Sequence, residues 1–200
     1  MRTKLFFIIS LLCSALIYIG CKSPEEKIDE IITQMKSQPV SIPYSQMSCW
    51  INDTIQKSRP WEKTAQLKLV VFTDSSSCSE CTLKRMYLWS DFVELEQKYN
   101  NQFYIMFIFQ TKKGTNVPEM ATSFHLTELN HPIYVDSKDV FRKLNPHLPE
   151  GEMYSIYLLD ENNNIQLVGS PLFNTGIEDE LHNILEEKLG KKEENLRHEI

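Results

Sequence analysis

Basic residues are few in this sequence, and they are scattered along it. The 200 residues include 21 lysines and arginines against 27 aspartates and glutamates, which gives a formal net charge of −6. No run of basic residues is longer than two. Because a nucleic-acid surface needs clustered positive charge to follow the phosphates, we expect no nucleic-acid partner.

Cysteine is also scarce, and no internal repeat is visible. Cys13 and Cys21 lie near the N-terminus, and Cys49, Cys78 and Cys81 lie in the body of the chain. Three body cysteines are too few for a disulfide-stapled scaffold. Hydrophobic residues make up 42% and charged residues 24%, values near the globular average that argue against collagen-like, low-complexity and polytopic membrane proteins. We therefore expect one globular domain, present as a monomer.

The N-terminus has the features of a signal peptide. Arg2 and Lys4 precede an uncharged run from Leu5 to Ile19, and this run is shorter than the ~20 apolar residues that a spanning helix requires. Gly20-Cys21 then resembles the lipobox of bacterial lipoproteins, in which the cysteine is acylated. The resemblance implies a cell-envelope lipoprotein held to a membrane through Cys21, on the periplasmic face or on the surface of the outer membrane.

The rest of the chain divides by composition into three parts. After the signal peptide (residues 1–20), residues 21–40 carry isoleucines at helical spacing and form a lipid-anchored stalk. Residues 41–190 form the folded domain, and residues 191–200 form a charged C-terminal tail.

Strand and helix patterns alternate through the folded domain. Apolar runs rich in β-branched and aromatic residues predict strands, and apolar positions at a period near 3.6 predict helices. The expected strands are 48–51, 67–72, 103–109, 132–135, 155–159 and 165–168, the last two forming a hairpin; the expected helices are 79–99, 117–129, 140–144 and 177–189. This order predicts an α/β fold with a central mixed sheet and helices on both faces.

Two of the body cysteines form a C-x-x-C motif, Cys78-Ser79-Glu80-Cys81, between a predicted strand and a predicted helix. At a helix N-terminus the unpaired backbone N–H groups lower a thiol pKa. We expect Cys78 to attack and Cys81, one turn deeper and shielded by its helix, to resolve. Glu80 opposes thiolate formation and is a candidate modulator.

The chain resembles the TlpA/ResA-like thioredoxin-like lipoproteins of Bacteroidetes from about Leu67 to Leu189. The resemblance is carried by the strand that leads into Cys78 and Cys81, by His131-Pro132-Ile133-Tyr134-Val135-Asp136, and by Tyr157-Leu158-Leu159-Asp160 with the following hairpin and helix. It implies a thioredoxin-like fold and dithiol–disulfide exchange at a redox-active centre. It also implies envelope protein thiols or disulfides as substrates and an upstream reductant, with no cofactor and no metal.

Three positions depart from that family's pattern. Ser77 stands where a tryptophan usually precedes the first cysteine, and Phe72 stands where a buried acid assists proton transfer. A cis-proline is expected next to Met153-Tyr154, where the sequence has none. Tyr154 and Asp74, which ends the strand, join Glu80 as candidate modulators. Thr73 and Ser75 do not complete a peroxiredoxin pattern.

Other hypotheses remain open at this point. Cys49 is expected to be a buried structural thiol, with a third redox thiol or a Cys₃His zinc site as the less favoured options. The whole domain could also be a redox-inactive module that binds a partner protein in the envelope, or an envelope metal carrier that needs Cys49 near the pair. Measurement of the reduction potential of the Cys78–Cys81 pair would distinguish a pair that exchanges disulfides from a static disulfide.

Overall fold

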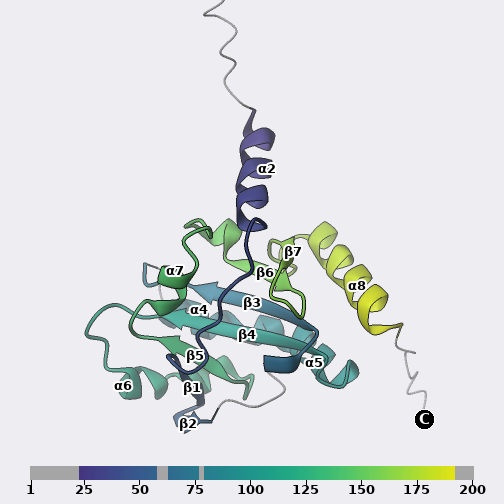
Figure 1. Cartoon of the computed structure of the whole chain (residues 1–200). Coiled ribbons are helices and arrows are strands. Elements are labelled where there is room, and N and C mark those ends of the chain that lie inside the picture. The colour runs from purple at the N-terminus through teal and green to yellow at the C-terminus, as the bar shows by residue number, and fades with distance from the viewer. Residues whose placement is uncertain (1–22, 58–62, 77–78, 192–200) are drawn as a thin grey trace, which may run out of the picture. The chain divides into compact units, whose positions relative to one another are not determined.

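The computed structural model describes residues 23–57, 63–76 and 79–191 (Figure 1). The chain divides into two compact units, residues 1–33 and residues 34–200. Cys21, Ser77 and Cys78 lie outside the described residues, as do the signal peptide and nearly all of the C-terminal tail. No helix in the described ranges is both long and apolar enough to cross a membrane.

Helix α2 (Pro24–Met35) forms within the predicted stalk. Ser23 and Glu26 make a reciprocal capping box at its start: the Glu26 N–H donates to Ser23 Oγ (3.1 Å), and the Ser23 N–H donates to Glu26 Oε2 (2.9 Å). These bonds satisfy backbone donors that a helix leaves unpaired in its first turn. The sequence Ser23-x-x-Glu26 therefore sets where the helix begins.

The larger unit holds a seven-stranded mixed sheet. Its strand order is β2-β1-β5-β4-β3-β6-β7. The strands are β1 (Ser48–Ile51), β2 (Thr54–Gln56), β3 (Leu67–Thr73), β4 (Phe103–Gln110), β5 (Ile133–Asp136), β6 (Ile156–Leu159) and β7 (Ile165–Val168). Strands β3, β4 and β5 run parallel to one another, and β1, β6 and β7 each run antiparallel to a neighbour.

Short helices complete the unit. The α-helices are α4 (Ser79–Arg85), α5 (Ser90–Lys98), α6 (Val117–Ala121), α7 (Val140–Leu144) and α8 (Thr175–Leu189), and the 3₁₀ turns are η1 (Met86–Trp89), η2 (Phe124–Thr127) and η3 (Glu152–Tyr154). In Figure 1, α4 and α5 lie behind the sheet, and the segment that leads into β1 crosses in front of it.

One face of the sheet carries the main hydrophobic core. Successive side chains of a strand alternate between faces, and the odd-numbered residues of β3 and β4 point to this face. They pack against α4, η1, α5 and α8 through the following residues: Leu69, Val71, Ile105, Phe107, Leu83, Met86, Trp89, Phe92, Leu181 and Leu185. Burying each such side chain contributes about 1.5–3 kcal/mol.

The other face is covered by α7 and by the segment before β1. Phe72 of β3 stacks on Phe141 of α7, with ring centroids 5.2 Å apart, and Tyr44 meets Tyr134 edge to face at 6.0 Å. Asp136, at the end of β5, accepts from the N–H groups of Val140 and Phe141 (3.0 and 2.7 Å) and so caps α7. Helices thus cover both faces, which confirms the predicted fold class.

Two predicted helices are broken. The 3₁₀ turn η1 interrupts the expected helix over 79–99. A 3₁₀ turn brings residues three apart onto one side, so both Met86 and Trp89 face the core. The expected helix over 117–129 is reduced to α6 and η2, whose buried residues are Ala121, Phe124 and Thr127. Strand β2 was not predicted, since Thr54–Gln56 is a mostly exposed edge strand without an apolar run.

Candidate functional site

The chain leaves the central strand β3 through a turn built by Asp74. Asp74 Oδ1 accepts from the backbone N–H of Ser76 (2.8 Å) and from its hydroxyl (2.5 Å). Such Asx turns reverse the backbone after a strand. The turn leads toward α4, which contains Glu80 in its first turn and then Cys81.

Cys81 is disulfide-bonded and exposed. The neighbouring helix positions Leu83 and Met86 are 1% and 2% exposed, so they form the buried side of this part of the chain. The prediction that Cys81 is shielded by its own helix is therefore wrong.

A groove of about 320 Å³ lies beside Cys81. Its walls come from the ends of β3 and β4, from α4 and η1, from the turn before β6 and from the loop between β7 and α8. The apolar lining residues include Val71, Phe107, Phe109, Met86, Trp89, Ile156 and Leu172. Phe173 and Leu88, which also line it, are 77% and 37% exposed, so the groove is bordered by apolar side chains that face solvent.

The segment where the resemblance places a cis-proline is a 3₁₀ turn. In η3 the Tyr154 N–H donates to the Gly151 carbonyl, and the Ser155 N–H donates to the Glu152 carbonyl, both at 3.2 Å. The Ser155 carbonyl accepts from the Phe72 N–H (2.9 Å). No peptide bond in the described part of the chain is cis. Because these backbone groups are already bonded, they cannot pair with an incoming strand without breaking the turn.

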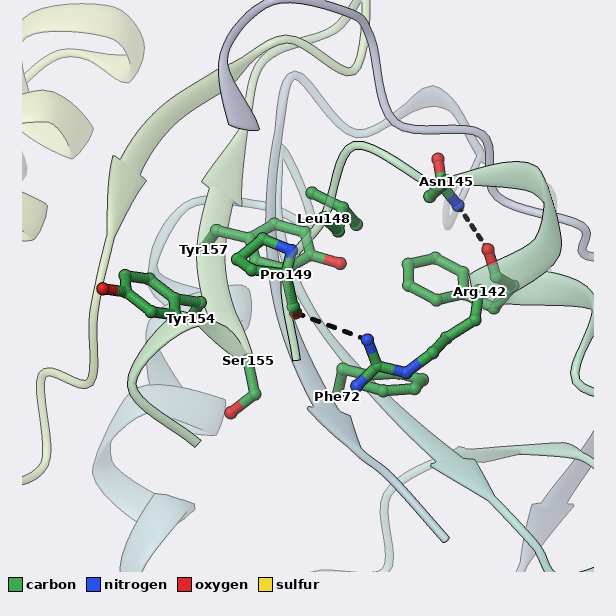
Figure 2. Close-up of a pocket in the computed structure, with 9 residues that line it drawn as sticks. Phe72, Arg142, Asn145, Leu148, Pro149, Tyr154, Ser155 and Tyr157 are labelled. Atoms are coloured by element: carbon green, nitrogen blue, oxygen red, sulfur yellow. Dashed lines mark hydrogen bonds between the residues drawn. The ribbon is translucent and has the colours of Figure 1, made fainter. Parts of the chain in front are cut away.

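Arg142 of α7 contacts Phe72, the residue that stands where the resemblance expects a buried acid (Figure 2). Its guanidinium carbon is 4.9 Å from the centroid of the Phe72 ring, Nη2 is 3.7 Å from Asp74 Oδ2, and Nη1 donates to the Pro149 carbonyl (3.3 Å). Arg142 therefore ties the turn after β3 to α7. The Arg142 cation over the Phe72 ring makes a favourable cation–π contact.

A small cavity adjoins Arg142. Its lining residues are Phe72, Phe141, Arg142, Asn145, Leu148, Pro149, Tyr154, Ser155 and Tyr157, and none of them is an acid. Burial raises the pKa of Tyr157 far above its ordinary value, against a smaller opposing effect of the Arg142 charge. Tyr157 is therefore a phenol at neutral pH. Figure 2 shows the Tyr154 ring directed away from the Arg142 guanidinium.

Cys49 lies far from the groove. Cys49 lies in β1, where it pairs with Tyr134 of β5, and β1 is three strands away from β3. Because side chains alternate between the faces of a sheet, the Cys49 side chain lies on the face opposite that of Val71. It is a thiol that is only 5% exposed. With neighbouring strands about 4.8 Å apart, Cys49 cannot reach a metal or a disulfide shared with Cys81. The zinc-site and carrier hypotheses, which both need that approach, are thus wrong, whereas a separate redox role of Cys49 stays a hypothesis.

The described residues contain no group of three or more His, Cys, Asp or Glu side chains that could hold a metal ion. The three candidate modulators lie at different places in the structure. Asp74 lies at the site, as a turn former paired with Arg142. Tyr154 borders it from the 3₁₀ turn, and Glu80 lies in the first turn of α4.

Comparison with solved structures gives similarities in fold at low sequence identity. They include a domain of a possible thiol–disulfide isomerase from Cytophaga hutchinsonii (16% identity, 77% of this chain and 95% of that chain, TM-score 0.49). A thioredoxin-like protein from Porphyromonas gingivalis matches at 15% identity over 76% and 95% of the two chains, with a TM-score of 0.44. The thioredoxin domain of a thiol–disulfide oxidoreductase from Bacteroides vulgatus matches at 17% over 61% and 81%, with a TM-score of 0.42. No family model and no curated protein sequence matches the chain.

The fold is thioredoxin-like. The topology carries this conclusion: a buried strand is followed by the helix that contains Cys81, a parallel strand comes next, and an antiparallel hairpin and a last helix close the unit.

Sequence reasoning missed Arg142 and the loop Ser170–Phe173. Arg142 follows a phenylalanine in an ordinary amphipathic pattern, and its partners Phe72 and Asp74 lie in a much earlier strand. The loop residues meet Cys81 only after the hairpin folds back beside β3. No local signal marks either feature.

Proposed function

We propose that the protein is an extracytoplasmic thiol–disulfide oxidoreductase that exchanges disulfides with envelope proteins through Cys78 and Cys81. The observation that carries the proposal is Cys81 itself: it is disulfide-bonded, it is exposed, and it lies in a helix directly after the central strand, beside an apolar groove. A structural disulfide would more simply be buried.

The proposed step balances without a cofactor. The Cys78 thiolate attacks one sulfur of a substrate disulfide, a mixed disulfide forms, and the second substrate sulfur leaves as a thiolate that takes up a proton. The Cys81 thiolate then attacks Cys78, releasing the first substrate sulfur and leaving the pair oxidised. An envelope dithiol of lower reduction potential returns two electrons and two protons.

We further propose that this chemistry takes place at a membrane in the cell envelope, with the lipid on Cys21 as the anchor. Export gives the disulfide a compartment in which it persists. Replacing Cys21 with serine is expected to move the protein from the membrane fraction to the soluble fraction and to remove the lipid mass. An unchanged mass and unchanged membrane retention would contradict the anchor.

One observation favours a second function, a redox-inactive module that binds a partner protein. The backbone groups of Tyr154 and Ser155 are bonded within their own turn, so the segment that would pair with a substrate strand is closed. In this alternative the disulfide of Cys81 is static. A very low reduction potential, below about −300 mV as in structural disulfides, would favour it.

Trapping of substrates tests the exchange mechanism. The Cys81→Ser variant cannot resolve a mixed disulfide, so it is expected to accumulate reducible adducts on Cys78 with envelope proteins. The Cys78→Ser variant is the matched control, because it keeps one exposed thiol at the same site. Adducts in equal yield from both variants would contradict the assigned order of attack.

The wild-type protein gives the second measurement. We expect its disulfide to be reduced reversibly at a potential between about −120 and −270 mV, the range of exchange proteins. If the Cys81→Ser variant captures nothing and the wild-type disulfide resists dithiol reductants, the binding module replaces the enzyme.

A further inference from the structure

Asp74 uses its two carboxylate oxygens on different parts of the protein. Oδ1 accepts from the N–H and the hydroxyl of Ser76, and Oδ2 lies 3.7 Å from Nη2 of Arg142 on α7. The two charged side chains are only 22% and 21% exposed, so solvent screens this ion pair less than it screens a pair on an open surface. One carboxylate therefore links the turn after β3 to a helix that packs on the sheet.

The helix that carries Arg142 is itself held at both ends. At the start of α7 the Asp136 carboxylate accepts from two backbone N–H groups. Just after its end the Asn145 amide makes two bonds with the Ser41 backbone, of 2.7 and 2.8 Å. The guanidinium of Arg142 lies over the Phe72 ring. Arg142 thus approaches Asp74 from a fixed support.

The turn that Asp74 holds is close in sequence to the disulfide of Cys81. Two residues separate Ser76 from the start of α4, and Cys81 is the third residue of that helix. Three residues of chain span at most about 11 Å. Helix α4 is fixed in turn by Leu83, which is 1% exposed in the main core. By its place in the sequence, Cys78 therefore lies on a short link between two fixed points.

We infer that Asp74 and Arg142 are positioning residues for the disulfide of Cys81: Arg142 holds Asp74, and Asp74 holds the turn at which the motif begins. The inference rests on the proposed function for Cys78 as the second thiol. Two thiols that are held close together lose little conformational freedom when their disulfide forms. Releasing the turn gives the reduced link a freedom that oxidation must then remove. Asp74 and Arg142 therefore favour the disulfide over the dithiol.

Equilibration with glutathione measures this effect in the full-length protein. The protein dithiol and one glutathione disulfide give the protein disulfide and two glutathione thiols, and alkylation with mass analysis reads the fraction of Cys81 in the disulfide. Ordering one backbone residue changes an equilibrium by about tenfold. Asp74→Ala is therefore expected to move the equilibrium about tenfold toward the dithiol, which raises the reduction potential by about 30 mV. Asp74→Asn keeps an oxygen that accepts from Ser76, so it should stay within about threefold of the wild type.

Arg142 is expected to act only through Asp74. Arg142→Met should move the equilibrium about threefold toward the dithiol in the wild type and leave it unchanged in Asp74→Ala, as expected for two residues that act in series. Lys143→Met is the matched control, because it removes an ion pair of similar length (3.8 Å, to Asp139) on the same helix, and it should not move the equilibrium.

Two results would overturn the positioning role. One is an unchanged equilibrium in Asp74→Ala, even if that variant is less stable, and the other is an equal shift by Arg142→Met in both backgrounds. The proposed function is tested separately. If the expected shifts occur but Cys81→Ser captures no envelope protein, the positioning role stands and the exchange function fails. Capture by Cys81→Ser with an unchanged equilibrium in Asp74→Ala has the opposite meaning.

Discussion

Replacing Glu96 with alanine is expected to destabilise the domain strongly. Glu96, on α5, is 6% exposed, and its Oε1 accepts from the Ile105 N–H of β4 (2.7 Å) and contacts His131 Nε2 (3.0 Å). Because a carboxylate only accepts, Nε2 carries the hydrogen of that bond. The His131 ring is itself 6% exposed and stacks on Tyr104, with centroids 5.6 Å apart. One carboxylate oxygen thus joins a helix, a central strand and the segment before β5.

The loss of stability follows from the two buried donors, the Ile105 N–H and His131 Nε2, that the substitution leaves without an acceptor. An unpaired buried donor costs about 1–3 kcal/mol, so the two donors together cost about 2–6 kcal/mol. We therefore expect Glu96→Ala to lower the free energy of unfolding by about 3–5 kcal/mol. For a domain of this size each 1 kcal/mol shifts Tm by about 2–4 °C, so Tm falls by roughly 10 °C.

Urea unfolding followed by far-UV circular dichroism measures the effect. Glu96→Gln keeps a carbonyl acceptor in place and is expected to cost about 1 kcal/mol, the value of an ordinary hydrogen bond. Glu94→Ala is the matched control, since Glu94 is an exposed glutamate on the same helix and should change stability by less than about 0.5 kcal/mol. The reasoning is refuted if Glu96→Ala and Glu94→Ala unfold at the same urea concentration.

Three further predictions concern single side chains. Cys49, buried in β1, should resist alkylation in the native reduced protein, and mass analysis that finds it labelled before Cys81 would contradict its placement. Burial lowers the pKa of His147, so the unfolded chain binds a proton first as pH falls below about 6.5. As pH falls, the free energy of unfolding of the wild type should therefore decrease by at most about 1.4 kcal/mol per pH unit, and His147→Leu should lack this decrease. Identical dependence of the unfolding free energy on pH in the two proteins would contradict this prediction. Arg142→Met should lower the free energy of unfolding by about 1–3 kcal/mol, because it removes the contact with the Phe72 ring and the hydrogen bond to the Pro149 carbonyl. Lys143→Met, at an exposed neighbouring position, should leave stability unchanged. Equal unfolding midpoints for the two variants would show that the Arg142 contacts contribute nothing.

Local patterns were sufficient for the central strands. Leu67–Thr73 and Phe103–Gln110 appear where their apolar, β-branched and aromatic runs predict them, because a strand with both faces buried needs such residues whatever its neighbours are. The closing helix also forms, as Thr175–Leu189, with Asn174 Oδ1 accepting from the Ile177 N–H at its start.

The break in the helix after the motif could not be predicted from periodicity. Met86 and Trp89 fit a continuous α-helix as well as a 3₁₀ turn, and the choice depends on where Phe107 and Val71 lie across the sheet. Edge strand β2 was missed for a related reason, since its residues pair only with β1 and are mostly exposed.

The sequence by itself determined the alternation of strands and helices and the position of Cys81 after a buried strand, because both depend on residues close together in the chain. The tertiary structure alone decided that Cys49 lies out of reach of Cys81, that Arg142 lies over the Phe72 ring, and that Ser170 lines the groove beside Cys81. Each of these depends on contacts between distant segments, and such contacts arise only when the sheet forms and its strands take their order.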